Sequence, residues 1–273
     1  MNKNSQNFLI LNNICKSYPG VKALDNVSLN IKCGEIHSLC GENGSGKSTM
    51  IKIISGVVRP DEGEIIIKDN PIKNVRAIDA IRNGIYIVYQ DLSLFPNLTV
   101  AENIYIEEII KKNNFYVNWQ QIERGSREAL EKINVKINPN SYVKDLSVAN
   151  KVLVEIAKSI TKKAELIIMD EPTSSLTKKE VDALFGVIMN LKKEGISILF
   201  VSHKLYEVIE ISDVITILRD GKLVGNFDAK NLTIKEFAYL VTGQKTKDET
   251  FISKKVIGKT NRHVLMEIRD LSW

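Results

Sequence analysis

The sequence predicts an α/β fold that has a mostly parallel sheet, an antiparallel β subdomain and a helical insertion. Three observations predict it: short apolar runs that end in glycine-rich or acidic segments, apolar residues at helical spacing between those runs, and an alternating apolar pattern near the N-terminus. Apolar strands separated by helices imply a parallel sheet, because parallel neighbours need a long crossover. With 273 residues, of which 44% are hydrophobic, the chain can bury a full core.

The N-terminal part of the chain predicts antiparallel strands. Apolar and polar positions alternate over residues 8–34, and residues 18–20 (Tyr-Pro-Gly) form a turn between two alternating runs. A second turn at 59–63 precedes another expected strand at 64–68. We expect these strands to pack beside the core of the fold.

A phosphate-binding loop lies between an expected strand at 36–40 and an expected helix at 50–54. The loop fits the pattern G-x-x-x-x-G-K-[ST] with the residues Gly41, Glu42, Asn43, Gly44, Ser45, Gly46, Lys47, Ser48 and Thr49. Glycines let backbone N–H groups approach a polyphosphate, Lys47 reaches its β- and γ-phosphates, and Ser48 offers a hydroxyl to Mg²⁺. The loop and its flanks therefore predict a P-loop NTPase core.

The rest of the chain continues the alternation of strands and helices. Its elements are expected at residues 85–89 (strand), about 91–160 (helical insertion), 166–169 (strand), 177–191 (helix), 198–201 (strand), 214–225 (hairpin) and 233–241 (helix). The helix in the middle of this series begins at a capping box formed by Thr177 and Glu180. Strands separated by helices of this length imply a parallel sheet that is covered on both faces.

Polar side chains follow three of these strands and predict ATP hydrolysis. Asp170 can hold Mg²⁺ through water, and Glu171 can polarise the attacking water. Gln90 can reach both the metal ion and the water, and His203 is placed at a strand end to contact the γ-phosphate. We therefore expect catalytic roles for Glu171, His203 and Gln90, and metal contacts from Ser48, Gln90 and Asp170. Loop polarity for Gln90 and a structural role for His203 are the simpler alternatives.

The composition argues against several other classes of function. Lys and Arg number 38 against 33 Asp and Glu, and their scatter as short pairs predicts a solvated surface and no nucleic-acid partner. The three cysteines lack a CxxC spacing and predict neither a metal site nor a disulfide, which suits a reduced cytosolic setting. No apolar run reaches the ~20 residues that span a bilayer, and the start of the chain does not read as a signal peptide. Other subunits would have to supply any membrane part.

In their order along the chain, these motifs resemble the ATP-binding cassette of ABC transporters over about residues 8–244. The positions that carry the resemblance are Tyr18, the phosphate loop, Gln90, Leu146, Ser147, Asp170, Glu171, Ser174, Ser175, Leu176 and His203. More narrowly, residues 84–91, 97–104 and 169–177 resemble the first of two cassettes in carbohydrate-importer ATPases, which carry both cassettes on one polypeptide.

The resemblance implies roles for further residues. Tyr18 would stack on the adenine of ATP, although a turn aromatic that packs on the strands is an alternative. Ser147 would donate a hydrogen bond to a γ-phosphate held by the opposite cassette. Beside it, Val148 and Ala149 replace the usual glycines of the signature, and Thr177 replaces an Asp. Groups that bind the chain's own nucleotide are thus intact, whereas groups offered across a dimer interface are altered.

The resemblance also implies the organisation and partners of the whole protein. Residues 1–244 would form one cassette, 245–263 a polar linker, and 264–273 the start of a second cassette, because their apolar pattern repeats that of residues 8–14. One more amphipathic strand is the alternative for the last segment. The partners would be the second cassette, integral membrane permease subunits sensed by residues 90–98 and, indirectly, an extracytoplasmic solute-binding protein.

The leading hypothesis for function is an ATPase that powers monosaccharide import at the cytoplasmic face of the cell membrane, as a peripheral subunit. Full activity is expected only with a second cassette. A nucleoside-importer ATPase of the same family is one alternative. A soluble tandem-cassette ATPase that acts on ribosomes is another, but such proteins generally have a longer, charged helical linker. DNA-repair cassettes are disfavoured because no heptad run of the required length is present.

Overall fold

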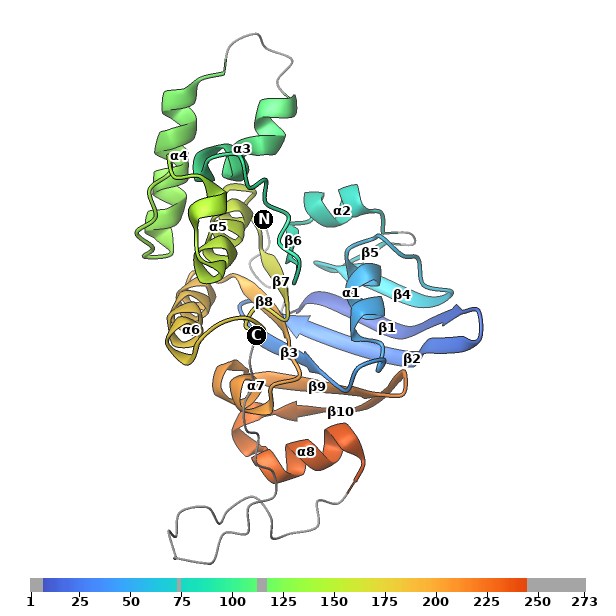
Figure 1. The fold of residues 1–273 in the computed structure, drawn as a ribbon. Coiled ribbons are helices and arrows are strands. Elements are labelled where there is room, and N and C mark those ends of the chain that lie inside the picture. The colour runs from blue at the N-terminus through green and yellow to red at the C-terminus, as the bar shows by residue number, and fades with distance from the viewer. Residues whose placement is uncertain (1–6, 73–74, 112–116, 245–273) are drawn as a thin grey trace, which may run out of the picture.

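The computed structural model describes residues 7–72, 75–111 and 117–244, which form two β-sheets and the helices around them. The linker and the second cassette expected after residue 244 lie outside the described residues. Figure 1 shows the antiparallel strands β1, β2, β4 and β5 on one side of the molecule and the helices α3, α4 and α5 on the other.

The larger sheet is mostly parallel and has the strand order β10-β9-β3-β8-β7-β6. Its strands are β3 (Ile36–Cys40), β6 (Ile85–Val88), β7 (Leu166–Asp170), β8 (Ser197–Val201), β9 (Val214–Arg219) and β10 (Lys222–Asp228). All neighbours pair in parallel except β9 and β10, which form an antiparallel hairpin. The carboxyl ends of β3, β8, β7 and β6 therefore meet at one edge of the sheet.

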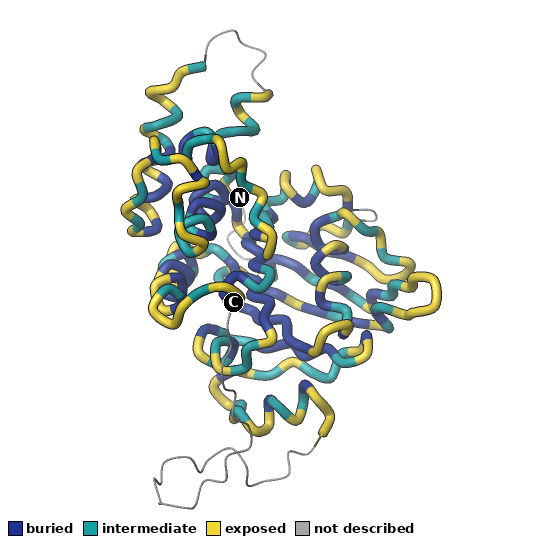
Figure 2. The backbone as a smooth tube through the Cα atoms, viewed as in Figure 1, coloured by how far each residue is buried: buried dark blue, intermediate teal, exposed yellow. Residues whose placement is uncertain are grey.

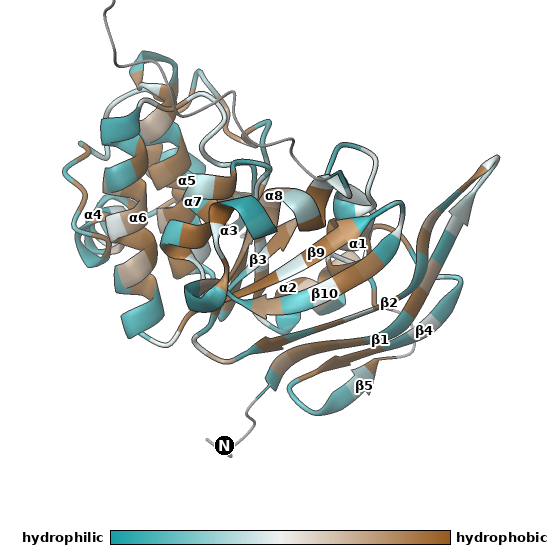
Figure 3. Cartoon of the chain, turned by 90° about the horizontal axis from the view of Figure 1, so that it is seen from below, coloured by the Kyte–Doolittle hydropathy of each residue, from teal (hydrophilic) through white to brown (hydrophobic). Residues whose placement is uncertain are grey.

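The smaller sheet is antiparallel and has the order β2-β1-β4-β5. Its strands are β1 (Asn7–Tyr18), β2 (Val21–Lys32), β4 (Glu62–Ile67) and β5 (Asn70–Ile72). The turn between β1 and β2 contains Gly20 at φ +80°, a left-handed conformation that glycine adopts without steric cost. Figure 3 shows hydrophobic residues running along β1 and β2, as the alternating sequence pattern predicts.

Eight α-helices and two short 3₁₀ helices fall within the described ranges. They are α1 (Lys47–Ile54), α2 (Ala77–Arg82), α3 (Val100–Lys111), α4 (Trp119–Lys132), η1 (Val143–Asp145), α5 (Val148–Thr161), α6 (Lys178–Lys193), α7 (Leu205–Ile211), η2 (Ala229–Asn231) and α8 (Ile234–Thr242). The helices α3, α4 and α5 occupy the region where the sequence predicts a helical insertion, and they pack on one another.

Two hydrophobic cores lie on opposite faces of the parallel sheet. On β7, Ile167 and Met169 belong to the core shared with the helices α3 to α8, whereas Leu166 and Ile168 belong to the core shared with α1 and the antiparallel sheet. All four side chains are fully buried, and Figure 2 shows the central strands as continuously buried. The sheet is thus covered on both faces, but a second sheet supplies much of the cover on one of them.

Four short elements, α2, β5, α7 and η2, are not predicted from the sequence. In α2 the apolar residues Ile78 and Ile81 stand at helical spacing, but six residues are too few to establish a period, and both side chains are exposed. The strand expected at 64–68 begins earlier, at Glu62. The strand expected at 85–89 ends at Val88, one residue before the predicted end.

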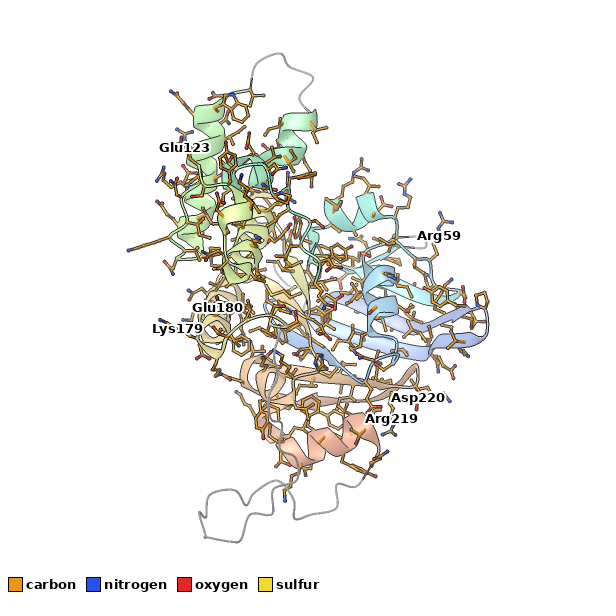
Figure 4. All side chains as sticks on the ribbon, viewed as in Figure 1. Arg59, Glu123, Lys179, Glu180, Arg219 and Asp220 are labelled. Carbon is orange, nitrogen blue, oxygen red and sulfur yellow. The ribbon has the colours of Figure 1, made fainter. Side chains whose placement is uncertain are left out.

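The capping box of α6 is present as predicted and explains the unusual Thr177. The Thr177 N–H donates to the Glu180 carboxylate at 2.9 Å, and the Glu180 N–H donates to the Thr177 hydroxyl at 3.4 Å. Figure 4 shows Glu180 and its neighbour Lys179 in the first turn of this helix. Threonine therefore performs at this position the N-cap function that aspartate can also perform.

We expect Thr177→Ala to lower the free energy of unfolding by about 1 kcal/mol, because it removes the N-cap acceptor of α6. Thr177→Asp should retain most of that stability, since an aspartate oxygen accepts the same backbone hydrogen bond. Urea denaturation of the three proteins provides the measurement. Equal midpoints for wild type and Thr177→Ala would show that the cap contributes nothing.

Candidate active site

The phosphate loop lies between β3 and α1 and is held there by close backbone approaches. Gly46 is the N-cap of α1 and has a left-handed φ of 104°. A Cβ atom at Gly46 would lie 2.5 Å from the carbonyl oxygen of Ala23, and one at Gly41 would lie 2.3 Å from that of Leu218. Only glycine fits at these two positions, so the backbone keeps a shape in which N–H groups of the loop and of the N-terminus of α1 are free to point at an anion.

Lys47, the first residue of α1, is fixed against the loop. It is 7% exposed, and its Nζ donates to the carbonyl oxygens of Gly41 at 2.8 Å and Glu42 at 2.9 Å. Burial lowers the pKa of Lys47, and the negative charges of Glu171 and Asp170 oppose that shift. The ammonium group and two carboxylates thus lie within electrostatic reach of one another.

The polar residues predicted at strand ends do meet at one edge of the parallel sheet. Asp170 is the last residue of β7, Gln90 follows β6, and His203 follows β8. Burial raises the pKa of Asp170, the neighbouring Glu171 raises it further, and Lys47 lowers it. A divalent cation at this edge would favour the charged form of Asp170 in the same way as Lys47 does.

Glu171 and His203 form a direct pair next to Asp170. The Nδ1 atom of His203 lies 2.8 Å from Oε1 of Glu171, and the Glu171 N–H donates to the carbonyl oxygen of Val201 at 2.9 Å. Glu171 has a φ of 49°, in the left-handed region that non-glycine residues seldom adopt. Strained conformations of this kind concentrate at functional sites, and this one turns the chain just after β7.

A cavity of about 550 Å³ unites these groups. It is lined by Tyr18, Val21, Ala23, Asn43, Gly44, Gly46, Lys47, Ser48, Thr49, Gln90, Asp170, Glu171 and His203. Two predicted cofactor-binding residues, Gly41 and Ser45, do not line the cavity. Ser45 is buried, and its hydroxyl oxygen has no hydrogen-bond partner among the described residues, which suits a loop that surrounds a phosphate. Lysine, backbone N–H groups and carboxylates in one cavity can bind a nucleoside triphosphate and activate water.

The donors at this site also suit Mg²⁺. Ser48, Gln90 and Asp170 all line the cavity and offer the oxygen ligands that Mg²⁺ prefers. In the part of the chain that the structure describes, no group of three or more His, Cys, Asp or Glu could hold a metal ion. A sparse set of protein oxygens fits an ion that usually keeps several waters and binds substrate phosphates.

Ser147, Val148 and Ala149 do not line this cavity. Ser147 is the N-cap of α5, where its hydroxyl accepts a hydrogen bond from the Asn150 N–H at 3.2 Å. Val148 is the first residue of the helix and is 47% exposed. The role predicted for these residues at another cassette's nucleotide stays a prediction.

Sequence reasoning missed two groups of residues around the site. Val21 and Ala23, in the alternating stretch that forms β2, gave no signal that they would line the cavity. The second group joins the turn after Glu171 to α7: the Thr173 hydroxyl donates to the Glu207 carboxylate, and Lys204 Nζ donates to the Thr173 carbonyl at 2.8 Å. Neither of these two contacts could be predicted, because the sequence analysis does not predict α7.

The fold and the site together define a nucleotide-binding domain of the ATP-binding cassette class. The chain belongs to the ABC transporter family, whose sequence model matches residues 24–174. Membership of this family implies that the chain binds ATP. The resemblance noted from the motifs is therefore confirmed, while a second cassette on the same polypeptide stays a prediction.

Two similar proteins are named for the import of ribose, galactose or methyl galactoside. A putative ribose/galactose/methyl galactoside import ATP-binding protein 1 of Agrobacterium fabrum is 44% identical and aligns with 88% of this chain and 48% of its own length. The galactose/methyl galactoside import ATP-binding protein MglA of Clostridium perfringens is 40% identical and aligns with 99% of this chain and 52% of its own length. The chain spans about half the length of the curated relatives it matches.

Solved structures confirm the predicted fold class. The ADP conformation of MJ1267, an ATP-binding cassette of an ABC transporter, matches with a TM-score of 0.77 and 25% identity over 88% of this chain and 97% of that chain. A dimeric, post-hydrolysis state of the cassette MJ0796, bound to ADP and Pi, matches with a TM-score of 0.71 and 27% identity over 82% and 100%. Among the helices in the described ranges, none is both long and apolar enough to cross a membrane.

Proposed function

We propose that this chain binds ATP with Mg²⁺ and hydrolyses the ATP to power import of a monosaccharide through an ABC transporter. The cavity that joins the phosphate loop to Asp170, Glu171 and His203 is the observation that carries the proposal. The names of the relatives, which describe import of ribose, galactose and methyl galactoside, support the choice of solute class.

We assign a step to each of the central residues. Lys47 and the loop N–H groups would hold the β- and γ-phosphates, and Tyr18 would contact the adenine. Glu171 would accept a proton from water as the water oxygen bonds to the γ-phosphorus and the bond to the β–γ bridging oxygen breaks. His203, paired with Glu171 at 2.8 Å, would orient that carboxylate and contact the γ-phosphate.

Ser48, Gln90 and Asp170 would hold Mg²⁺, with Asp170 acting through water. When bound, the ion would neutralise charge on the phosphate oxygens. The products of the step are ADP and inorganic phosphate, and Glu171 must release its proton before the next turnover.

The partners that we propose follow from the same role. They are a second cassette on the full-length chain, integral membrane permease subunits and, indirectly, an extracytoplasmic solute-binding protein, with this chain at the cytoplasmic face of the membrane. The relatives are about twice as long as this chain, and their length supports a second cassette. No nucleic-acid partner is proposed.

Uptake of labelled solutes by the intact assembly tests the proposed function. Ribose, galactose, other hexoses and nucleosides would be supplied to cells with the wild-type chain and with the variant Lys47→Ala. We expect Lys47-dependent uptake of a monosaccharide. Uptake of nucleosides alone would support a nucleoside importer, and the absence of any dependence on Lys47 would contradict a transport role.

We also propose that the two ATP sites of the assembly are unequal. Val148 occupies the first helical position of α5, and its exposed β-branched side chain restricts the backbone that would present Ser147 to the other cassette's nucleotide. Each hydrogen bond lost to a charged phosphate would cost about 1.5–3 kcal/mol. The ATP on this chain's own loop would then be hydrolysed, whereas the ATP of the second cassette would serve mainly as a clamp.

Restored glycines test this asymmetry. The 273-residue chain can pair only with its own signature, so its ATPase rate should be low, and Val148→Gly with Ala149→Gly should raise it about tenfold or more. Lys179→Gly places a glycine in the first turn of α6 and controls for loss of helix stability. A wild-type rate that already matches both the glycine variant and the full-length assembly would contradict unequal sites.

A further inference from the structure

Lys16 lies against Tyr18, the aromatic residue of the nucleotide cavity. Its Nζ atom is 5.7 Å from the centroid of the Tyr18 ring and donates to Oδ1 of Asp61 at 2.6 Å. The Lys16 side chain is only 17% exposed, although it carries a charge. A lysine that is this well covered and bonded holds its ammonium group in one place beside the ring.

Asp61 also fixes the backbone of the strand end that carries Tyr18. Its Oδ2 accepts from the Ser17 N–H at 2.7 Å, and its own N–H donates to the carbonyl oxygen of Cys15 at 2.8 Å. The pairing register between β1 and β2 shifts at Lys16, so the ladder is irregular where these bonds form. The hydrogen bond from Lys16 lowers the pKa of Asp61, which therefore remains a carboxylate at neutral pH.

Tyr18 lines the cavity, whereas Lys16 and Asp61 do not. Lys16 and Asp61 can therefore affect a bound nucleotide only through the Tyr18 ring and the strand that carries it. We propose that Lys16 and Asp61 are positioning residues that set the orientation of Tyr18 for the base of the nucleotide and do not act on its phosphates. This inference rests on the proposed function, because it requires that the cavity binds ATP.

The same sheet contains a matched control pair. Lys68 Nζ lies 5.4 Å from the centroid of the Phe8 ring and donates to Oε1 of Glu165 at 2.7 Å. Phe8 is buried and does not line the cavity. Lys68→Met therefore removes the same combination of ion pair and cation–ring contact at a place where it cannot affect a bound base.

Titration calorimetry with ATP and with inorganic tripolyphosphate tests the proposal on the 273-residue chain. We expect Lys16→Met to weaken ATP binding about two- to fivefold, because a Tyr18 ring that is no longer held must be ordered when the base binds, and to leave tripolyphosphate binding unchanged. Asp61→Asn, which keeps an oxygen for the Ser17 N–H but loses the charge that holds Lys16, should act in the same direction. Lys16→Arg should retain the ATP affinity of the wild type, and Lys68→Met should change the affinity for neither ligand.

A double substitution decides whether Lys16 acts through the ring. In a Tyr18→Leu background, Lys16→Met should cause no further loss of ATP affinity. Equal ATP affinities for wild type and Lys16→Met would overturn the proposal, as would a parallel loss of tripolyphosphate binding. A wild-type chain that binds tripolyphosphate and ATP with equal affinity would show that the base is not recognised, and it would refute the role of Tyr18 while leaving phosphate binding intact.

Discussion

Glu171→Gln is expected to cut ATP turnover in the full assembly by ~100-fold or more while ATP binding persists. Glutamine keeps the size of the side chain and can still hydrogen bond to His203, but it cannot accept a proton from water. Phosphate release and equilibrium binding of ATP, measured on the same preparation, separate the two effects. Unchanged hydrolysis in this variant would mean that another group activates the water.

The chain provides a control for this substitution in a second Glu–His pair. Glu35 Oε1 lies 2.7 Å from Nδ1 of His37, a buried histidine that also contacts the Thr216 hydroxyl at 2.6 Å. This pair does not line the nucleotide cavity. Glu35→Gln should therefore affect stability and leave the turnover of the folded protein near that of wild type. His203→Ala, in contrast, should slow the same step as Glu171→Gln.

Lys47→Ala is expected to weaken ATP binding about 10- to 150-fold, because it removes a charge-assisted contact worth ~1.5–3 kcal/mol. The ammonium already lies against the loop, with Nζ 2.8 Å from the Gly41 carbonyl oxygen, so little side-chain ordering remains to be done on binding. Titration calorimetry of the isolated chain measures the change.

Lys52→Ala is the matched control for Lys47, since Lys52 lies on the same helix but is exposed and does not line the cavity. Its ATP affinity should stay near the wild-type value. Equal ATP affinities for wild type and Lys47→Ala would contradict the assignment of this lysine. A comparable loss in both variants would point to damage to α1 in place of a lost phosphate contact.

The residues predicted at the strand ends share the cavity because their strands carry strong signals. The runs before Asp170 and His203 are short, fully apolar and bounded by polar residues, which predicts buried parallel strands. Once the strands are parallel and adjacent, the groups that follow them must meet at one edge of the sheet. The phosphate loop was predictable for a similar reason, since its glycines are required by local backbone geometry.

Other features depend on tertiary contacts that no local pattern reports. Asp61 reaches Lys16 across 45 positions of sequence, and its neighbours read only as a turn. The left-handed backbone of Glu171 could not be predicted from the sequence either, because glutamate has no preference for that conformation. Short elements such as α2 and α7 contain too few residues to show a period.

The site follows strands that contribute side chains to both cores, and this placement limits how easily the site can be deformed. β3, β7 and β8 lie in the interior of the sheet and place side chains in both cores, whereas β6 and β10 lie at its edges. Amide protons in the interior strands can exchange with solvent only when both cores open together, whereas the edges can exchange through local fraying. The Lys47 loop and the Asp170–Glu171 turn are thus attached to the slowest-exchanging part of the molecule. Brief fraying of the edge strands therefore leaves the spacing between the loop and the turn unchanged.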